Sequence, residues 1–284
     1  MSSNIAILDN IVIVLVEPLQ SGNVGMVVRA LMNTGFTRLR IVNPHHYDPK
    51  IVSAAAHRSE AFQETIEFYD DVPSALHDVN LVVSASNRQR ELGPPLMPPD
   101  EMAPIVLEHA KIGTAAILFG REDWGLPNEI VHRSHYQLYI PVDPAYASLN
   151  LAQAVLLTTY ELRRAVLKPR DDLPEVGIDP RDPPATEAEF TAAMDSILEA
   201  LGKAGFFKPG QEPAKRLKFD RLFRRTRPTA SEAGLLRAMG FVLERELSCS
   251  KYAQRWEERK RKMQEDEQSR KANRRPEPPH MKIF

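Results

Sequence analysis

An apolar strand pattern and a glycine-containing loop follow one another in Ile117-Leu-Phe-Gly-Arg-Glu-Asp-Trp-Gly-Leu-Pro-Asn-Glu129. A short run of large apolar residues before a glycine is typical of a strand that is buried on both faces of a parallel sheet. In open α/β sheets ligands bind at the carboxyl ends of the strands, and glycine lets the backbone approach a ligand closely. We therefore predict an α/β fold with a ligand site here. For Glu122 the alternative to a catalytic role is a structural salt bridge or a helix cap.

The same strand and loop pattern occurs twice more, in Glu17–Arg29 and Ile140–Ala152. In the first segment Asn23 stands where a helix N-cap would, so the alternative to a functional loop is an ordinary capped turn. Ser148 or Asn150 is an equally good cap for the helix of the other segment. Neither the G-x-G-x-x-G nor the Walker pattern is present in the first segment, which disfavours the usual nucleotide cofactors. Three such loops on one sheet predict a pocket.

Between residues 11 and 168 short apolar runs alternate with helical patterns, which indicates a mostly parallel sheet with covering helices. The predicted strands are Ile11–Val16, Leu39–Val42, Leu81–Ser84, Ala115–Phe119 and Gln137–Ile140. The predicted helices are Val24–Asn33, Ile51–His57, Pro73–His77, Glu101–His109 and Leu149–Val166. Arg29 lies at the edge of the apolar face of its helix, so its guanidinium should reach solvent or a ligand.

The composition of the chain changes after residue 168. Residues 169–186 are rich in proline and acids and predict a linker between residues 1–168 and a helical extension over 187–248. Residues 249–284 form a charged tail that can bury little. Basic residues gather in the extension, with Asp220 as the single acid among Lys215, Arg216, Lys218, Arg221, Arg224, Arg225 and Arg227. This run predicts a site for phosphates, and the alternative is a solvated helix face.

Overall composition excludes several classes of protein. The 284 residues contain a single cysteine, Cys249, so an internal disulfide framework and a multi-cysteine zinc site are excluded and a reducing compartment is favoured. His45 and His46 are adjacent rather than at ligand spacing, and we expect no metal. No apolar stretch is long enough for a membrane span, so we expect a cytoplasmic protein that has no membrane partner.

Together the three segments resemble the SPOUT superfamily of RNA methyltransferases, in its SpoU or TrmH branch. The residues that carry the resemblance are, in order, Asn23-Val-Gly25 with Arg29, Phe119-Gly-Arg-Glu122 with Gly125-Leu, and Ile140-Pro141 with Ser148-Leu-Asn150. One motif alone would be weak, whereas the ordered set is highly specific. It covers roughly residues 10–168. The segment Arg216–Pro228 further resembles the extension of the TrmJ-type tRNA methyltransferases, which methylate the ribose at position 32 of the anticodon loop.

The resemblance implies a parallel sheet whose C-terminal part is tied in a trefoil knot, an exception to the rule that connections do not thread loops. It also implies a homodimer that completes the site, with S-adenosylmethionine bound among the knot loops. Carried over by position, the cofactor contacts are Ala85, Ser86, Asn87, Gly120, Ile140, Ala147, Ser148 and Leu149. Relatives often have Thr-Ser where this chain has Ala85-Ser86, so a hydroxyl contact at residue 85 is lost while backbone contacts survive.

The reaction that the resemblance implies is methyl transfer to a ribose 2'-hydroxyl. The attacking oxygen must be aligned with the methyl group and must lose its proton as it attacks. A guanidinium deprotonates very unfavourably, so we assign Arg29 to binding an RNA phosphate and stabilising the developing alkoxide. Asn23 would orient Arg29 or the substrate, and Glu122 would hold a basic partner in place. Ser148 and Asn150 would position the ribose or its proton.

Structured RNA, most specifically tRNA, is the expected substrate. The expected RNA contacts are Arg88, Arg90, Arg121, Lys215, Arg216, Arg224 and Arg225. Phe219 and Phe223 are expected in the core of the extension rather than in stacks with bases. Two alternatives stay open, because the catalytic motifs do not distinguish RNA targets: a ribosomal-RNA 2'-O-methyltransferase, and a non-catalytic RNA-binding protein with the same fold. A Rossmann-type oxidoreductase is disfavoured by the missing glycine fingerprint.

Overall fold

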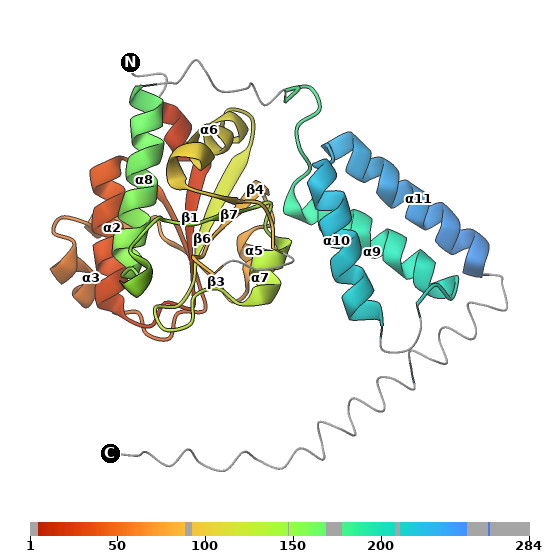
Figure 1. Ribbon diagram of the computed structural model, residues 1–284, viewed down its shortest axis with the longest axis horizontal. Coiled ribbons are helices and arrows are strands. Elements are labelled where there is room, and N and C mark those ends of the chain that lie inside the picture. Colours follow the sequence, from red (N-terminus) through yellow and green to blue (C-terminus); the bar gives the residue numbers. More distant parts are fainter. Residues whose placement is uncertain are drawn as a thin grey trace, which may run out of the picture. The chain divides into compact units, whose positions relative to one another are not determined.

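The computed structural model describes residues 5–88, 93–146, 148–168, 178–207, 211–248 and 261, and its residues 11–138 contain a seven-stranded sheet (Figure 1). Its strands are β1 (Ile11–Val16), β2 (Arg38–Val42), β3 (Glu67–Tyr69), β4 (Val79–Ala85), β5 (Leu96–Met97), β6 (Thr114–Phe119) and β7 (Tyr136–Leu138). Neighbouring strands pair in parallel in the order β3-β2-β1-β6-β4-β7-β5. The predicted α/β class with a parallel sheet is confirmed.

The position of β7 gives the sheet its special connectivity. Along the chain β5 comes directly after β4, yet β7 lies between these two strands. On one side the Ser86 amide donates to the Leu138 carbonyl at 2.9 Å, and on the other the Gln137 amide donates to the Pro95 carbonyl at 2.8 Å. Consecutive strands usually lie side by side, so a late strand inserted between two earlier ones is the order expected of a threaded chain.

Helices cover both faces of this sheet. The first face carries α2 (Ser21–Thr34), α3 (Pro49–Ala55), α6 (Pro99–Ala110) and α8 (Leu151–Leu167), which pack on alternate residues such as Ile13 and Ile117. The second face carries the short helices α5 (Val72–Ala75) and α7 (Asn128–Arg133), which pack on residues such as Val14 and Leu118. Side chains of a strand alternate between faces, so the apolar run of β1 is buried on both.

Short elements that the apolar pattern does not predict complete this part of the chain. They are the 3₁₀ turns η1 (Ala6–Asn10) and η2 (Pro144–Tyr146), the helices α4 (Glu60–Gln63) and α7, and the strands β3 and β5. Among the described residues, none of the helices combines the length and the apolar run that a membrane crossing needs.

The expected helical extension consists of α9 (Glu187–Lys203), α10 (Glu212–Thr226) and α11 (Ala230–Ser248). The chain divides into two compact units, of which the first contains residues 1–191 and 220–234 and the second residues 192–219 and 235–284. The division therefore does not follow the expected linker at 169–186. Two contacts hold later residues in the first unit: Asn80 Nδ2 donates to the Pro184 carbonyl at 2.7 Å, and Arg224 forms an ion pair with Glu187.

Within the second unit, α11 packs on α9 through its small residues. A Cβ at Gly240 would lie 2.3 Å from Ser196 Oγ, so only glycine permits this close approach. The Ser196 hydroxyl donates to the Arg237 carbonyl at 3.0 Å, and Lys203 forms an ion pair with Glu244. Phe219 is partly buried and makes an edge contact with Phe206.

Candidate active site

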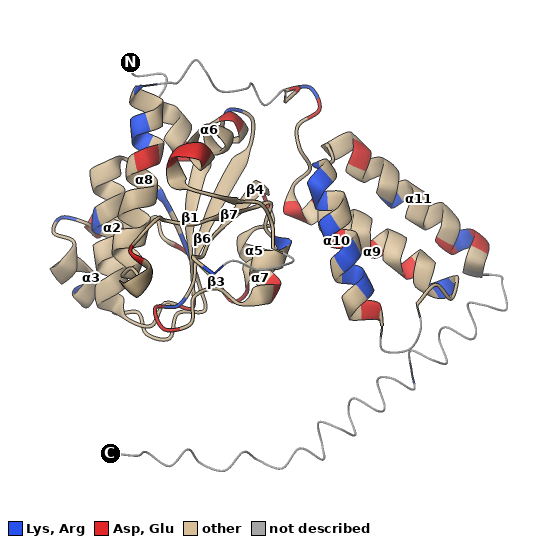
Figure 2. Cartoon of the chain, in the orientation of Figure 1, with Lys and Arg blue, Asp and Glu red and all other residues tan. Residues whose placement is uncertain are grey.

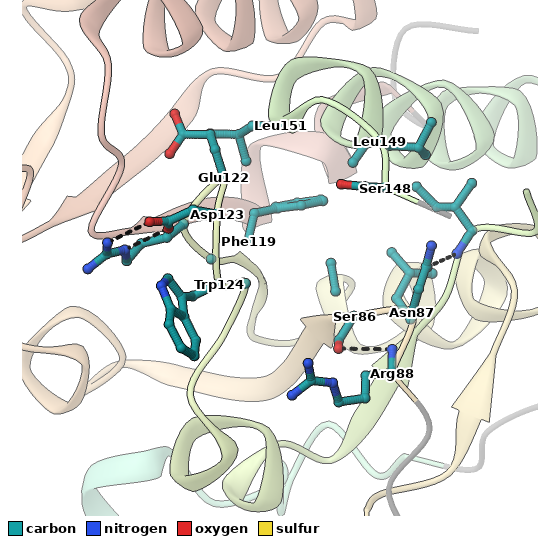
Figure 3. A pocket seen from close by; sticks show the side chains of 17 residues that line it. Ser86, Asn87, Arg88, Phe119, Glu122, Asp123, Trp124, Ser148, Leu149 and Leu151 are labelled. Atoms are coloured by element: carbon teal, nitrogen blue, oxygen red, sulfur yellow. Dashed lines mark hydrogen bonds and ion pairs between the residues drawn. The ribbon is translucent and has the colours of Figure 1, made fainter. Parts of the chain in front are cut away.

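A pocket of about 370 Å³ opens at the carboxyl ends of β4, β6 and β7 (Figure 3). Its walls are the loops that follow these strands and the first turns of α8. They comprise Ala85, Ser86, Asn87, Arg88, Phe119, Gly120, Arg121, Glu122, Asp123, Trp124, Gly125, Leu138, Ile140, Ser148, Leu149, Leu151 and Ala154. The pocket lies at the sheet edge where the sequence places a ligand.

The structure brings the expected cofactor residues together. Seven of the eight, namely Ala85, Ser86, Asn87, Gly120, Ile140, Ser148 and Leu149, line this one pocket. Ala147 falls outside the described residues. The loop after β4 is fastened to the end of β7, because Gln137 Nε2 donates to the Ser86 and Arg88 carbonyls at 2.8 Å each. Asn87 Oδ1 accepts the Ile140 amide at 3.2 Å.

Two glycines permit the tight loop after β6. A Cβ at Gly120 would lie 2.1 Å from the Gly125 carbonyl carbon. Because the atom it meets belongs to the backbone, no side-chain movement relieves the clash. Gly125 has φ of 69°, in the left-handed region that favours glycine, and its amide donates to the Arg121 carbonyl at 2.8 Å. The loop therefore doubles back on itself and fixes the residues at its tip.

A chain of hydrogen bonds links the three motif segments. Glu122 Oε2 accepts the Leu19 amide at 3.0 Å, and Glu122 Oε1 accepts Asn23 Nδ2 at 2.8 Å. Asn23 Oδ1 in turn accepts Asn150 Nδ2 at 3.2 Å. Among the described residues the Glu122 carboxylate accepts from these two amide donors, while the basic partner expected for it stays a prediction.

Of the two asparagines that could cap a helix, only one does so. Asn23 is not an N-cap, because α2 begins two residues earlier, at Ser21, and Asn23 is therefore free to reach Glu122. Asn150 is the N-cap of α8: its side chain accepts the Ala152 amide at 2.9 Å and forms a capping box with Gln153. The capping role predicted as the alternative for Asn150 is thus confirmed, and its amide group still reaches Asn23.

Arg29 lies apart from the pocket. It is exposed on α2, as expected from the edge of the apolar face, between the exposed side chains of Met26 and Met32. It is not among the residues that line the pocket. Of the expected catalytic residues, Glu122 and Ser148 line the pocket, and Asn23 and Asn150 are connected to it through Glu122.

The arginines expected to contact RNA near the pocket have different surroundings. Arg121 donates to both carboxylate oxygens of Asp123, at 3.0 and 2.9 Å, and lies 3.7 Å from Glu17. These hydrogen bonds raise the pKa of Arg121 and lower the pKa of Asp123. Arg121 therefore serves first to shape the loop. Arg88 lines the pocket, and Arg90 falls outside the described residues.

In the extension one expected RNA contact is corrected. Arg224 is only 5% exposed, and its guanidinium donates to both oxygens of Glu187 at 2.5 and 2.7 Å, because the helical period turns it inward. Lys215 Nζ donates to the Phe206 carbonyl at 3.0 Å, and Arg216 pairs with Asp195 at 2.5 Å. Arg225 is exposed. In Figure 2 the blue Lys and Arg positions are gathered along the ribbon of α10.

Several pocket residues were not predicted, among them Asp123 and Trp124. Asp123 holds Arg121, and Trp124 is 81% exposed at the pocket. The signal for Trp124 was available in the sequence, since a large aromatic residue directly after two acids and before Gly125 interrupts an otherwise polar loop. No group of three or more His, Cys, Asp or Glu side chains in the described part of the chain is placed to hold a metal ion.

Comparison with known proteins identifies the family of this chain. Residues 10–160 match the model of the SpoU rRNA Methylase family. A tRNA (cytidine/uridine-2'-O-)-methyltransferase TrmJ from Pectobacterium atrosepticum is 36% identical, covering 82% of this chain and 95% of that protein. An uncharacterized tRNA/rRNA methyltransferase from Haemophilus influenzae is 35% identical, covering 86% of this chain and 98% of that protein.

Solved structures show the same fold. The crystal structure of TrmJ from Z. mobilis ZM4 superposes with a TM-score of 0.70 at 29% identity, covering 82% of this chain and 98% of that one. A probable methylase family protein from Haemophilus influenzae superposes with a TM-score of 0.54 at 33% identity, covering 86% of this chain and all of that one. Because the family model matches more than half of the residues, this chain belongs to the SpoU rRNA methylase family.

Proposed function

We propose that this chain transfers a methyl group from S-adenosylmethionine to a ribose 2'-hydroxyl of tRNA, at position 32 of the anticodon loop. The observation that carries the proposal is the pocket at the ends of β4, β6 and β7, to which the chain Asn150, Asn23 and Glu122 is hydrogen-bonded. The relatives named as tRNA (cytidine/uridine-2'-O-)-methyltransferases support the substrate.

The residues of the pocket fit S-adenosylmethionine. Its volume lies within the range of about 300–1,000 Å³ that small-molecule sites have. Leu138 and Leu151 offer an apolar surface for a purine, and Ser86 and Asn87 offer polar groups for the ribose and amino acid parts. The absence of a Cβ at Gly120 lets a ligand approach the backbone closely. The cofactor would supply the methyl group, and the protein supplies position and charge.

In the mechanism that we propose, the hydrogen-bonded chain fixes polar atoms at the place of reaction. Glu122 holds the Asn23 amide, and Asn23 holds the Asn150 amide, so none of the three side chains turns freely. Ser148, at the entry to α8, is exposed and reaches the pocket, where its hydroxyl would position the ribose. Such preorganised groups lower the barrier because they need not reorient as charge develops.

We further propose that a second copy of the chain completes the site. Arg29 is outside the pocket, on the exposed side of α2, and both α2 and the helix α8 that contacts it carry exposed apolar side chains. These side chains are Met26, Met32, Leu156, Leu157 and Tyr160. Covering them with another copy would bury apolar surface and would place Arg29 at the junction of two copies. There its permanently charged guanidinium would bind an RNA phosphate and stabilise the developing alkoxide.

The extension would hold the substrate through its phosphates. Lys218 and Arg225 on α10 are exposed, and contacts of this kind bind RNA without regard to sequence. We place the protein in the cytoplasm, where tRNA is available as a substrate. The ribosomal-RNA alternative shares the same pocket, and the relatives named as tRNA methyltransferases favour tRNA.

The test is transfer of labelled methyl from S-adenosylmethionine to unmodified tRNA transcripts, with ribosomal-RNA fragments alongside. We expect label in tRNA. Label in ribosomal RNA alone would keep the chemistry and overturn the tRNA substrate. No label in either, despite cofactor binding in calorimetry, would favour the non-catalytic alternative.

A variant tests the role of Arg29. Arg29→Ala should abolish transfer while the affinity for S-adenosylmethionine in calorimetry stays within about two-fold, because Arg29 does not line the pocket. Asn33→Ala, at another exposed position of the same helix, is the matched control and should keep normal turnover. Near-normal turnover of Arg29→Ala would contradict the role, and sedimentation of both variants separates a lost dimer from lost chemistry.

A further inference from the structure

Trp124 is a large apolar side chain that the fold leaves in solvent. It is 81% exposed, although an indole offers one of the largest apolar surfaces of any residue. It also lines the pocket, so its exposure is at the site rather than on a distant surface. In Figure 3 the indole projects from the loop after β6, with none of the other labelled side chains packed against it. An exposed indole at a site is typical of a contact that forms on binding.

The loop holds this indole in a fixed position. Gly120 packs directly against Gly125, and the Gly125 amide donates to the Arg121 carbonyl, so the four residues between the two glycines form a closed turn. The ion pair of Arg121 with Asp123 braces the same turn. A ligand that contacts Trp124 therefore meets a surface that is already ordered and loses little affinity to ordering the loop.

The charges around Trp124 favour an uncharged ring over a phosphate. Glu122 and Asp123 directly precede it, and Glu17 lies 3.7 Å from Arg121. The positive charge of Arg121 is offset by Asp123 and Glu17, so the tip of the loop does not attract an anion. A nucleobase has a neutral aromatic face and can therefore approach the acidic tip of the loop. The sugar-phosphate backbone would have to approach elsewhere.

We propose that Trp124 stacks on a nucleobase of the RNA substrate, either the target nucleotide or its neighbour in the loop. This inference rests on the proposed function, since it assumes that an RNA loop reaches the pocket. Proteins recognise single-stranded RNA loops by stacking unpaired bases on aromatic side chains. Stacking does not depend on the identity of the base, so Trp124 would position the nucleotide without selecting cytidine or uridine.

Fluorescence distinguishes an RNA base from the adenine of the cofactor. The chain has two tryptophans, Trp124 and Trp256, so Trp256→Phe leaves Trp124 as the single reporter. We expect unmodified tRNA to quench and shift the emission of Trp124 when no cofactor is present. Because Trp124 also lines the cofactor pocket, S-adenosylhomocysteine alone should change the emission, but by less than tRNA does. Quenching by S-adenosylhomocysteine and none by tRNA would assign the indole to the cofactor and overturn the proposal.

Kinetics of three variants supply an independent test. Trp124→Ala should raise KM for tRNA by about ten-fold or more, and the loss of affinity for S-adenosylmethionine, whose pocket Trp124 also lines, should be much smaller. Trp124→Phe, which keeps an aromatic face, should recover most of the loss, and Trp124→Leu, which keeps apolar bulk without a ring, should not. Since Trp124 is exposed, all three variants should unfold at the wild-type temperature.

Several results would overturn the proposal. One is a wild-type KM for tRNA in Trp124→Ala. Another is equal activity of the Leu and Phe variants, which would show that apolar bulk rather than stacking matters. A third is dissociation of Trp124→Ala into monomers in sedimentation, which would assign the indole to a contact between copies. If the wild-type protein itself methylates no RNA, the proposed function fails instead, and that outcome is distinct from all three.

Discussion

Replacing Asn23 with aspartate should place two carboxylates against each other in the centre of the site. Asn23 Nδ2 lies 2.8 Å from Glu122 Oε1. At that separation two unit charges repel by roughly 1.5 kcal/mol in a water-like medium and by roughly 6 kcal/mol at an effective dielectric constant of about 20. Both side chains are half-buried, so the repulsion lies between these values.

Protonation of one of the two carboxylates limits the free energy that this repulsion can cost. Raising the pKa of a carboxyl from about 4.3 to 7 costs about 4 kcal/mol, and beyond that one of the two groups would simply be protonated at pH 7. We therefore expect Asn23→Asp to lose about 3 kcal/mol in the free energy of unfolding at pH 7, measured by urea denaturation. The loss should shrink at pH 5, where the shared proton is easier to take up.

A second substitution should restore the lost stability. In the double variant Asn23→Asp with Glu122→Gln, the new amide at 122 donates to the new carboxylate at 23, and the Leu19 and Asn150 donors keep acceptors. The double variant should thus be more stable than Asn23→Asp alone, with a favourable coupling energy of about 2 kcal/mol. If the double variant loses as much free energy of unfolding as the two single variants lose together, the hydrogen-bonded chain is refuted. A stable but inactive double variant would show that the Asn23 amide also touches the substrate.

Two further predictions concern the backbone of the pocket and a buried histidine. Gly120→Ala should abolish S-adenosylmethionine binding in calorimetry, because its Cβ would lie 2.1 Å from the Gly125 carbonyl carbon and the loop must move; unchanged affinity would contradict the tight loop. Burial, with a smaller contribution from Arg227, lowers the pKa of His109 to about 4. In the unfolded chain His109 binds a proton near pH 6.5, whereas in the folded chain it does so only near pH 4. The free energy of unfolding should therefore fall by about 2 kcal/mol between pH 7 and pH 5 because of this residue. His109→Gln should flatten that pH dependence, and an unchanged slope in urea denaturation would show that His109 titrates normally.

The sequence predicts most of the first unit because its elements carry strong patterns. The all-apolar β1 and the helical apolar spacing of α2 leave one interpretation each; β1 forms where expected, and α2 contains the predicted Val24–Asn33 but begins three residues earlier, at Ser21. The strands β3 and β5 are too short for a pattern, since their three and two residues are only partly buried at the sheet edges. The insertion of β7 between β4 and β5 follows from the family resemblance, because no local pattern specifies which strands become neighbours.

In the site too, the sequence predicts which residue types are present but not which residues bond to one another. Residue types in the three loops predict a pocket at one edge, and the pocket forms there. Hydrogen-bond partners are set by tertiary structure, so the sequence gives no reason to pair Glu122 with Asn23 rather than with a basic side chain. Arg224 shows the limit of a charge run: six neighbours in a basic segment suggest a solvated face, yet the helical period turns this one side chain inward to Glu187.

The central claim is that the pocket directs methyl transfer to one ribose hydroxyl of tRNA. The most direct measurement compares labelled methyl transfer to an unmodified tRNA transcript with transfer to the same transcript carrying a 2'-deoxyribose at position 32, followed by mass spectrometry of the digested nucleotides. The account predicts a ribose methyl at position 32 in the first transcript and none in the second. Equal labelling of the two transcripts, or a methyl group on a base, would contradict it.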